Sequence, residues 1–264
     1  MKGCLGLLVL LLLAGCASSG RNGLEIDRSH PSAGADSRVQ FIVLHYTATD
    51  LPGSLAALTG TRVSSHYLIS ARPARIYQLV DENRRAWHAG DSEWQGRTWL
   101  NASTIGIELV NPGYTTGPDG QRIWHPYAEE QISTLIALLK DIMRRHGLKP
   151  GAIVAHSDIA PQRKVDPGPL FPWPALARAG LVPWPDPALV QQWQLQFATR
   201  LPDARWFQAQ LARFGYRVPD SGAFDPATRR VIAAFQMRYR PAGCEGNPDA
   251  ETAALLAVLN ARAP

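Results

Sequence analysis

The sequence predicts an α/β domain followed by a small all-α domain. Short, nearly continuous apolar runs of the kind that form buried strands recur in the first half of the chain. A long stretch with helical periodicity follows them, and the C-terminal part carries mainly helical patterns. This order predicts a mixed central sheet with flanking helices, and then a domain of three helices.

Several segments have the pattern of strands. Residues 39–44 are rich in β-branched and aromatic side chains, as buried strands are. Residues 67–70 and 76–80 are apolar and are separated by a short loop that contains Pro73, so they predict a hairpin. Residues 105–110 form a further apolar run, which the Asn-Pro-Gly sequence after it brings to an end.

The helical periodicity begins at Glu129 and ends at Gly147. Its apolar positions fall on one broad stripe: Ile132, Leu135, Ile136, Leu138, Leu139, Ile142 and Met143. Residues 153–155 then form a short buried run that leads directly into His156. We therefore expect one long helix packed against the sheet, followed by a last strand.

The N-terminus has the features of a secretion signal. Its apolar run, residues 5–14, is too short to span a bilayer, which takes about 20 residues in a helix. The run ends in Leu13-Ala14-Gly15-Cys16, which resembles the lipobox of bacterial lipoproteins. We expect a signal peptide over residues 1–15 and a lipidated tether over residues 16–37, with Cys16 carrying the lipid. The alternative is a buried apolar helix that happens to end in cysteine.

The lipobox implies a cellular location. Multiple acyl chains on Cys16 would hold the protein on a membrane. Ala17 follows the cysteine, where lipoproteins kept in the inner membrane usually have aspartate, so the resemblance implies an outer-membrane lipoprotein facing the periplasm. Once Cys4 leaves with the signal, Cys244 is the one remaining thiol, and no internal disulfide is expected.

Composition and charge are those of an ordinary globular protein. Apolar residues make up 45% and charged residues 19% of the 264 residues, enough for a proper core. The formal charge of +5 is a mild basic bias that is specific for no polyanion, and no nucleic-acid partner is expected.

A Pro- and Trp-rich stretch after Pro169 divides the chain near residue 190, so we expect one domain over residues 38–190 and a second over residues 195–264. In the second, Asp225 followed by Pro226 predicts a helix start. Its segments 207–211, 214–216, 221–228 and 231–236 together resemble the three-helix peptidoglycan-binding domain.

Two histidines and an aspartate lie at or just after the ends of predicted buried strands: His45, His156 and Asp166. Two imidazoles and a carboxylate suit Zn²⁺, and three protein ligands leave its fourth tetrahedral position open for water, as catalytic zinc sites require. Spacing alone is weak support, because a histidine at a strand end is more often structural.

Five motifs surround these residues, at positions 44–48, 63–69, 86–90, 105–111 and 155–169. In sequence and in order they resemble the motifs of the N-acetylmuramoyl-L-alanine amidases of the amidase type 2 family. The resemblance implies an amidase/peptidoglycan-recognition-protein-like fold. It also implies that His45, His156 and Asp166 bind zinc and that Glu108 and Lys164 are the catalytic pair.

The catalytic pair also has a chemical rationale. Amide hydrolysis needs a proton carrier and a positive group beside the developing oxyanion. Glu108 stands in an otherwise apolar strand, where a carboxylate without a task is costly; a structural pairing with an arginine is the alternative. Lys164 is two residues from Asp166, so in an extended segment both side chains project to the same face.

The same motifs suggest four substrate-binding residues: His66, Trp87, His88 and Asn111. Arg97, in Gln95-Gly96-Arg97, resembles a basic position that contacts the carboxylates of the stem peptide in related amidases, so it is expected to bind substrate as well. For the two histidines, the expected role is contact with substrate or orientation of a metal ligand, and a structural hydrogen bond is the alternative. Core packing is the alternative for Trp87, and a solvated surface position is the alternative for Arg97.

Together these features predict a zinc-dependent amidase that hydrolyses the bond between N-acetylmuramic acid and L-alanine in peptidoglycan and muropeptides, in cell-wall turnover or recycling. A non-catalytic peptidoglycan-recognition protein is one alternative. A structural linker between outer membrane and wall is another. Neither rival needs Glu108 and Lys164 beside a complete ligand set.

Overall fold

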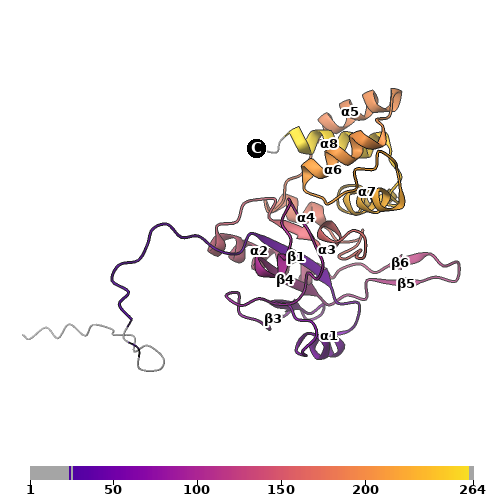
Figure 1. Cartoon of the computed structure of the whole chain (residues 1–264). Helices are drawn as coiled ribbons and strands as arrows, with labels where there is room; N and C mark the ends of the chain where they lie inside the picture. Colours follow the sequence, from indigo (N-terminus) through magenta and orange to yellow (C-terminus); the bar gives the residue numbers. More distant parts are fainter. Residues whose placement is uncertain (1–23, 25, 262–264) are drawn as a thin grey trace, which may run out of the picture. The chain divides into compact units, whose positions relative to one another are not determined.

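The computed structural model describes Leu24 and residues 26–261 of the chain (Figure 1). The predicted signal peptide and Cys16 lie outside the described residues. Among these residues, Leu24 and residues 26–36 belong to one unit, and residues 37–261 belong to another. Residues 26–36 contain no helix or strand. Within the described part of the chain, no helix combines the length and the apolar character needed to cross a membrane.

The second unit contains a five-stranded mixed sheet in the order β3-β2-β4-β1-β7. Strand β1 (Phe41–Tyr46) pairs in parallel with both β4 (Thr104–Leu109) and β7 (Ile153–Ala155). Strand β2 (Tyr67–Ile69) is parallel to β4 and forms the predicted antiparallel hairpin with β3 (Ile76–Gln78). The predicted fold class is confirmed.

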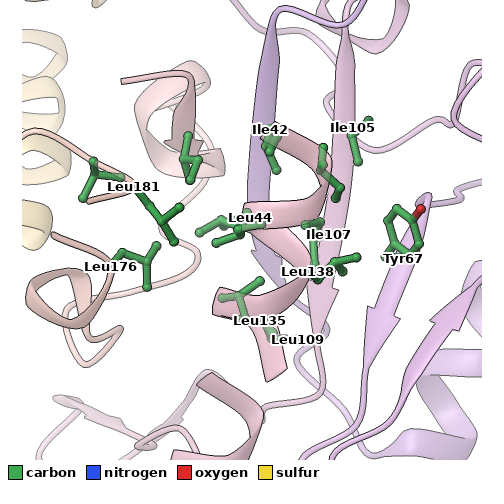
Figure 2. Packing of buried hydrophobic residues seen from close by; sticks show 14 of the residues in the cluster. Ile42, Leu44, Tyr67, Ile105, Ile107, Leu109, Leu135, Leu138, Leu176 and Leu181 are labelled. Carbon is green, nitrogen blue, oxygen red and sulfur yellow. The ribbon is translucent and has the colours of Figure 1, made fainter. Parts of the chain in front are cut away.

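Helix α2 (Glu129–His146) covers one face of the sheet and ends at Gly147, whose φ of 66° is the left-handed conformation that glycine adopts readily. Figure 2 shows Leu135 and Leu138 of α2 beside Leu44 and Ile107 of the strands. Burying each such aliphatic side chain stabilises the fold by about 1.5–3 kcal/mol. This apolar core lies on the face of the sheet that α2 covers, and it holds the strands in place.

The C-terminal part is helical, as predicted. Its elements are α5 (Pro187–Thr199), α6 (Ala204–Phe214), α7 (Pro226–Tyr239), η3 (Pro241–Gly243) and α8 (Ala250–Ala261). The Asp225 side chain caps α7 by accepting a hydrogen bond from the Thr228 amide at 2.7 Å. Asp186 begins α5 in the same way, with proline at the first helical position, so this helix runs through the expected boundary between residues 190 and 195.

The other face of the sheet shares a core with these helices. Val43, Val154 and Ile159 belong to one buried apolar cluster with Phe207 and Phe235. The helical part is therefore packed directly on the sheet-bearing part.

Smaller elements complete the chain: α1 (Leu51–Leu58), η2 (Leu100–Ala102), the hairpin of β5 (Tyr114–Thr116) and β6 (Arg122–Trp124), α3 (His156–Ile159) and α4 (Trp173–Arg178).

Candidate active site and metal centre

The site lies at the carboxyl ends of adjacent parallel strands. His45 on β1 stands opposite Glu108 on β4 in the register of the sheet. Side chains alternate between the faces of a strand, and Leu44 belongs to the core beneath α2. His45 and Glu108 therefore both project from the opposite face, where a cleft lies.

His156 follows β7 and opens the short helix α3. The loop that carries Asp166 is tied to this helix, because the Ser157 amide donates to the Asp166 carbonyl at 2.9 Å. The segment that follows the last strand thus holds the two candidate ligands, His156 and Asp166, in one small, hydrogen-bonded unit.

His45, His156 and Asp166 converge as a group that could hold a metal ion. The Nδ1 atoms of the two histidines are 2.8 Å apart, and Asp166 Oδ2 lies 3.2 Å from His45 Nδ1 and 2.9 Å from His156 Nδ1. Ligand atoms around a tetrahedral zinc, with bonds of about 2.0–2.1 Å, are about 3.3 Å apart. The triangle has the size of one face of such a site, slightly contracted.

The electrostatics favour a cation at this point. Burial, reinforced by His156, lowers the pKa of His45 to about 4, so this imidazole is neutral near pH 7. Burial alone would raise the pKa of Asp166, but the neighbouring His156 and His45 hold it well below its usual value. The neutral His45 imidazole, His156 Nδ1 and the Asp166 carboxylate therefore lie close to one another, and a metal ion bound between them would be held by all three. The residues present fit a metal ion of the zinc type.

Glu108 is the carboxyl group of this site with the raised pKa. Burial, reinforced by the charge of Asp166, raises the pKa of Glu108 to about 8, against the opposing effect of Lys164. Its Oε2 is buried and makes no hydrogen bond to any residue that the structure describes. A buried carboxyl that titrates near neutrality can accept or donate a proton at working pH.

The cleft has a volume of about 620 Å³. Lys164 and all three candidate metal ligands line it together with Glu108. The remaining lining residues come from the β1–α1 segment, the loops around residues 63 and 87, the β5 hairpin and the loop before Asp166: Tyr46, Thr47, Ala48, Thr49, Ser54, Ala57, Leu58, Val63, Ser64, Trp87, His88, Pro112, Tyr114, Arg163 and Val165.

The predicted substrate-binding residues divide into two groups. Trp87 is 49% exposed and lines the cleft, and His88 lines it while hydrogen-bonding to His45 Nε2 at 3.0 Å. The remaining three do not line it. Their assignment to substrate stays a prediction.

His66, Asn111 and Arg97 make local contacts instead. His66 is buried, and its ring nitrogens bond to the Arg84 carbonyl and the Gly106 amide. The Asn111 amide donates to two carbonyls, those of His125 and Pro126, and its oxygen accepts from the Gly113 amide. Arg97 forms an isolated backbone bridge with Trp94.

Two parts of the cleft wall have no counterpart in the sequence-based site. Tyr114 belongs to the β5–β6 hairpin, whose signal is present in the sequence as Gly117-Pro118-Asp119-Gly120, a strong turn pattern between two short β-prone segments. Arg163 lies in the motif at residues 155–169, directly before Lys164, which that motif identified as a catalytic residue.

Comparisons with known proteins show the family of the chain. Residues 35–169 match the N-acetylmuramoyl-L-alanine amidase family model, and residues 200–256 match that of a putative peptidoglycan-binding domain. The chain is 46% identical over 261 residues to N-acetylmuramoyl-L-alanine amidase AmiD of Escherichia coli strain K12, covering 94% of each chain.

Solved structures extend the likeness to the fold. The complex of E. coli AmiD with the substrate anhydro-N-acetylmuramic acid-L-Ala-D-γ-Glu-L-Lys superposes with a TM-score of 0.82 at 45% identity, covering 91% of this chain and 95% of that one. AmpDh3 of Pseudomonas aeruginosa superposes with a TM-score of 0.84 at 38% identity, covering 91% of this chain and 99% of that one. The chain therefore belongs to the N-acetylmuramoyl-L-alanine amidase family and is an amidase, as its sequence motifs predicted.

Proposed function

We propose that this amidase is zinc-dependent and hydrolyses the amide between N-acetylmuramic acid and the L-alanine of the stem peptide, in cell-wall turnover or recycling. The observation that carries the proposal is the convergence of His45 Nδ1, His156 Nδ1 and Asp166 Oδ2 in a cleft that also contains Glu108 and Lys164. The likeness to AmiD in complex with an anhydromuramyl peptide supports peptidoglycan fragments as substrates.

His45, His156 and Asp166 would hold the zinc ion. When bound, zinc supplies Lewis-acid polarisation of a carbonyl and lowers the pKa of a water molecule. Zinc is the expected metal because two imidazoles and one carboxylate form a typical ligand set for catalytic zinc.

Glu108 would carry the proton. Its carboxylate takes a proton from the attacking water, and the resulting acid returns it to the leaving nitrogen of L-alanine. The pKa of about 8 indicates that burial favours the protonated acid, which the second half of this cycle requires. Lys164 would place its ammonium group beside the carbonyl oxygen and stabilise the negative charge that develops there.

The metal assignment is tested by Asp166→Ala. This change removes the anionic ligand and should leave the purified chain with less than one-tenth of the zinc bound by wild type. Asp119→Ala, in the turn of the β5–β6 hairpin, is the matched control and should retain zinc. One equivalent of zinc in both variants, measured by elemental analysis, would refute the ligand set.

The helical domain would bind the cell wall, as its match to a peptidoglycan-binding family supports. The protein would act as an outer-membrane lipoprotein facing the periplasm, with Cys16 lipidated; the lipobox sequence and Ala17 support this location. Cys16→Ser should move the protein from the outer-membrane fraction to the soluble fraction of fractionated cells. Unchanged membrane association would contradict the anchor.

A further inference from the structure

Behind His45, hydrogen bonds link two more side chains in a row. His45 Nε2 lies 3.0 Å from His88 Nδ1, and His88 Nε2 lies 3.1 Å from Thr104 Oγ1. The Thr104 hydroxyl in turn donates to the Leu100 carbonyl at 2.7 Å. The row therefore starts at a candidate metal ligand and ends at a backbone carbonyl.

The end of the row determines where each proton lies. A carbonyl can only accept a hydrogen bond, so the Thr104 hydroxyl donates its proton to the Leu100 carbonyl. The hydroxyl oxygen must then accept the hydrogen bond from His88 Nε2–H. A neutral imidazole has a single ring proton, so His88 Nδ1 is left as an acceptor. That acceptor faces His45 Nε2, which must carry the proton of His45. The lone pair of His45 is then on Nδ1, the atom that faces His156 and Asp166.

We infer that His88 and Thr104 are positioning residues that fix the Nε2–H tautomer of His45 and so present its Nδ1 lone pair to the metal. The inference rests on the proposed zinc site and adds to it a reason why Nδ1 is the ligand atom.

The surroundings hold His88 in place. The ring lies against Gly106, where a Cβ would come within 2.5 Å of the imidazole, so a larger residue there would displace it. The Asn101 side-chain oxygen accepts from the amides of both His88 and Ala89, at 3.1 and 2.8 Å. The Ala89 carbonyl lies 3.3 Å from His156 Nε2 and sets the same tautomer there. One anchored dipeptide thus orients both histidine ligands.

The tautomers can be read directly by nitrogen NMR of the full chain with ¹⁵N-labelled histidine. With zinc bound, His45 and His156 should carry their protons on Nε2 and bind through Nδ1, and His88 should carry its proton on Nε2. A proton on His45 Nδ1 or on His88 Nδ1 would overturn the inference. The His88 tautomer is also decisive in the metal-free chain, so the inference is tested even if the metal proves not to be zinc.

Thr104→Val tests the consequence, because valine keeps the shape and removes the hydroxyl. Loss of a residue that orients a metal ligand should weaken zinc affinity by about 10-fold to 100-fold, measured by competition with a chelator. Thr104→Ser should restore most of this affinity. Thr228→Val, a buried threonine in α7 that accepts from the Gln208 amide, controls for general destabilisation and should bind zinc like wild type.

Two results would contradict the inference: wild-type zinc affinity in folded Thr104→Val, or equal losses in Thr104→Val and Thr228→Val. If wild type itself binds no zinc, the zinc proposal fails. The His88 tautomer then decides by itself whether the hydrogen bonds from Thr104 through His88 to His45 fix the tautomer of His45.

Discussion

Arg238 of α7 forms a buried ion pair with Asp158 of α3, with Nη1 and Oδ2 3.1 Å apart. Asp158 also accepts from the Tyr216 hydroxyl at 2.5 Å and from the Ala155 amide at 2.8 Å. The Arg238 guanidinium lies 4.1 Å from the centre of the Trp173 ring. The helical domain is thereby joined to the short helix that begins at His156.

Arg238→Met should lower the free energy of unfolding by about 3–5 kcal/mol, because it leaves the Asp158 charge buried without its partner. Arg205→Met is the matched control: its pair with Asp220 is exposed and 4.0 Å long, so its loss should cost less than about 1 kcal/mol. Denaturant unfolding measures both. Equal, small losses would show that the Arg238–Asp158 contact is dispensable.

Deleting residues 195–264 should impair cleavage of soluble muropeptides as well as of insoluble sacculi. The deletion removes Phe207 and Phe235 from the core that they share with Val43 and Ile159, and it removes both side-chain partners of Asp158. The test compares the initial rates of the truncated and the full chain on each of the two substrates. A truncated chain with the full rate on soluble muropeptides would show that the helical domain acts in wall binding alone.

Glu108→Gln should keep its zinc and lose at least about 100-fold in kcat, the usual scale for general acid–base catalysis. The amide has nearly the same shape as the carboxyl group but cannot carry the proton. Steady-state kinetics on a defined muropeptide, together with zinc analysis of the same preparation, separates lost chemistry from lost metal. A kcat close to that of wild type would remove Glu108 from the mechanism.

Because of Glu82, the free energy of unfolding should depend on pH. Burial opposes its ionisation, but hydrogen bonds from Arg145, Tyr67 and His146 lower its pKa to about 2. A carboxylate with a lowered folded-state pKa stabilises the fold above its unfolded pKa, and this contribution is lost as the pH falls through the folded value. Wild type should exceed Glu82→Gln in stability by about 1–3 kcal/mol at pH 7. The gap should close between about pH 4.5 and pH 2. Thermal unfolding across this range would refute the account if the gap stayed constant.

Local sequence patterns were enough for the buried framework. The strands β1, β4 and β7 follow from continuous apolar runs, and α2 follows from its apolar stripe, because both patterns are produced directly by burial. Helix α5 was missed, since its prolines suggested a break although Pro187 stands at the first helical position, where proline is favourable. The β5–β6 hairpin was missed because its strands are short and lie mostly at the surface.

The site shows a similar division. The convergence of His45, His156 and Asp166 could be anticipated, because parallel strands bring their carboxyl ends together and the motifs supplied the residue types. The surroundings of His66, Asn111 and Arg97 could not, because a motif does not reveal which backbone atoms a side chain meets. Only the folded chain brings the His66 ring to the Gly106 amide and the Asn111 amide to the Pro126 carbonyl.

The most direct test of the central claim is the mass of the products formed when the zinc-loaded chain is incubated with a defined muropeptide. Cleavage of the amide between N-acetylmuramic acid and L-alanine should yield the intact saccharide and a free peptide with N-terminal alanine. Both products should disappear when a chelator removes the metal and return when zinc is restored. Uncleaved muropeptide, or a peptide cut at another bond, would contradict the proposed function.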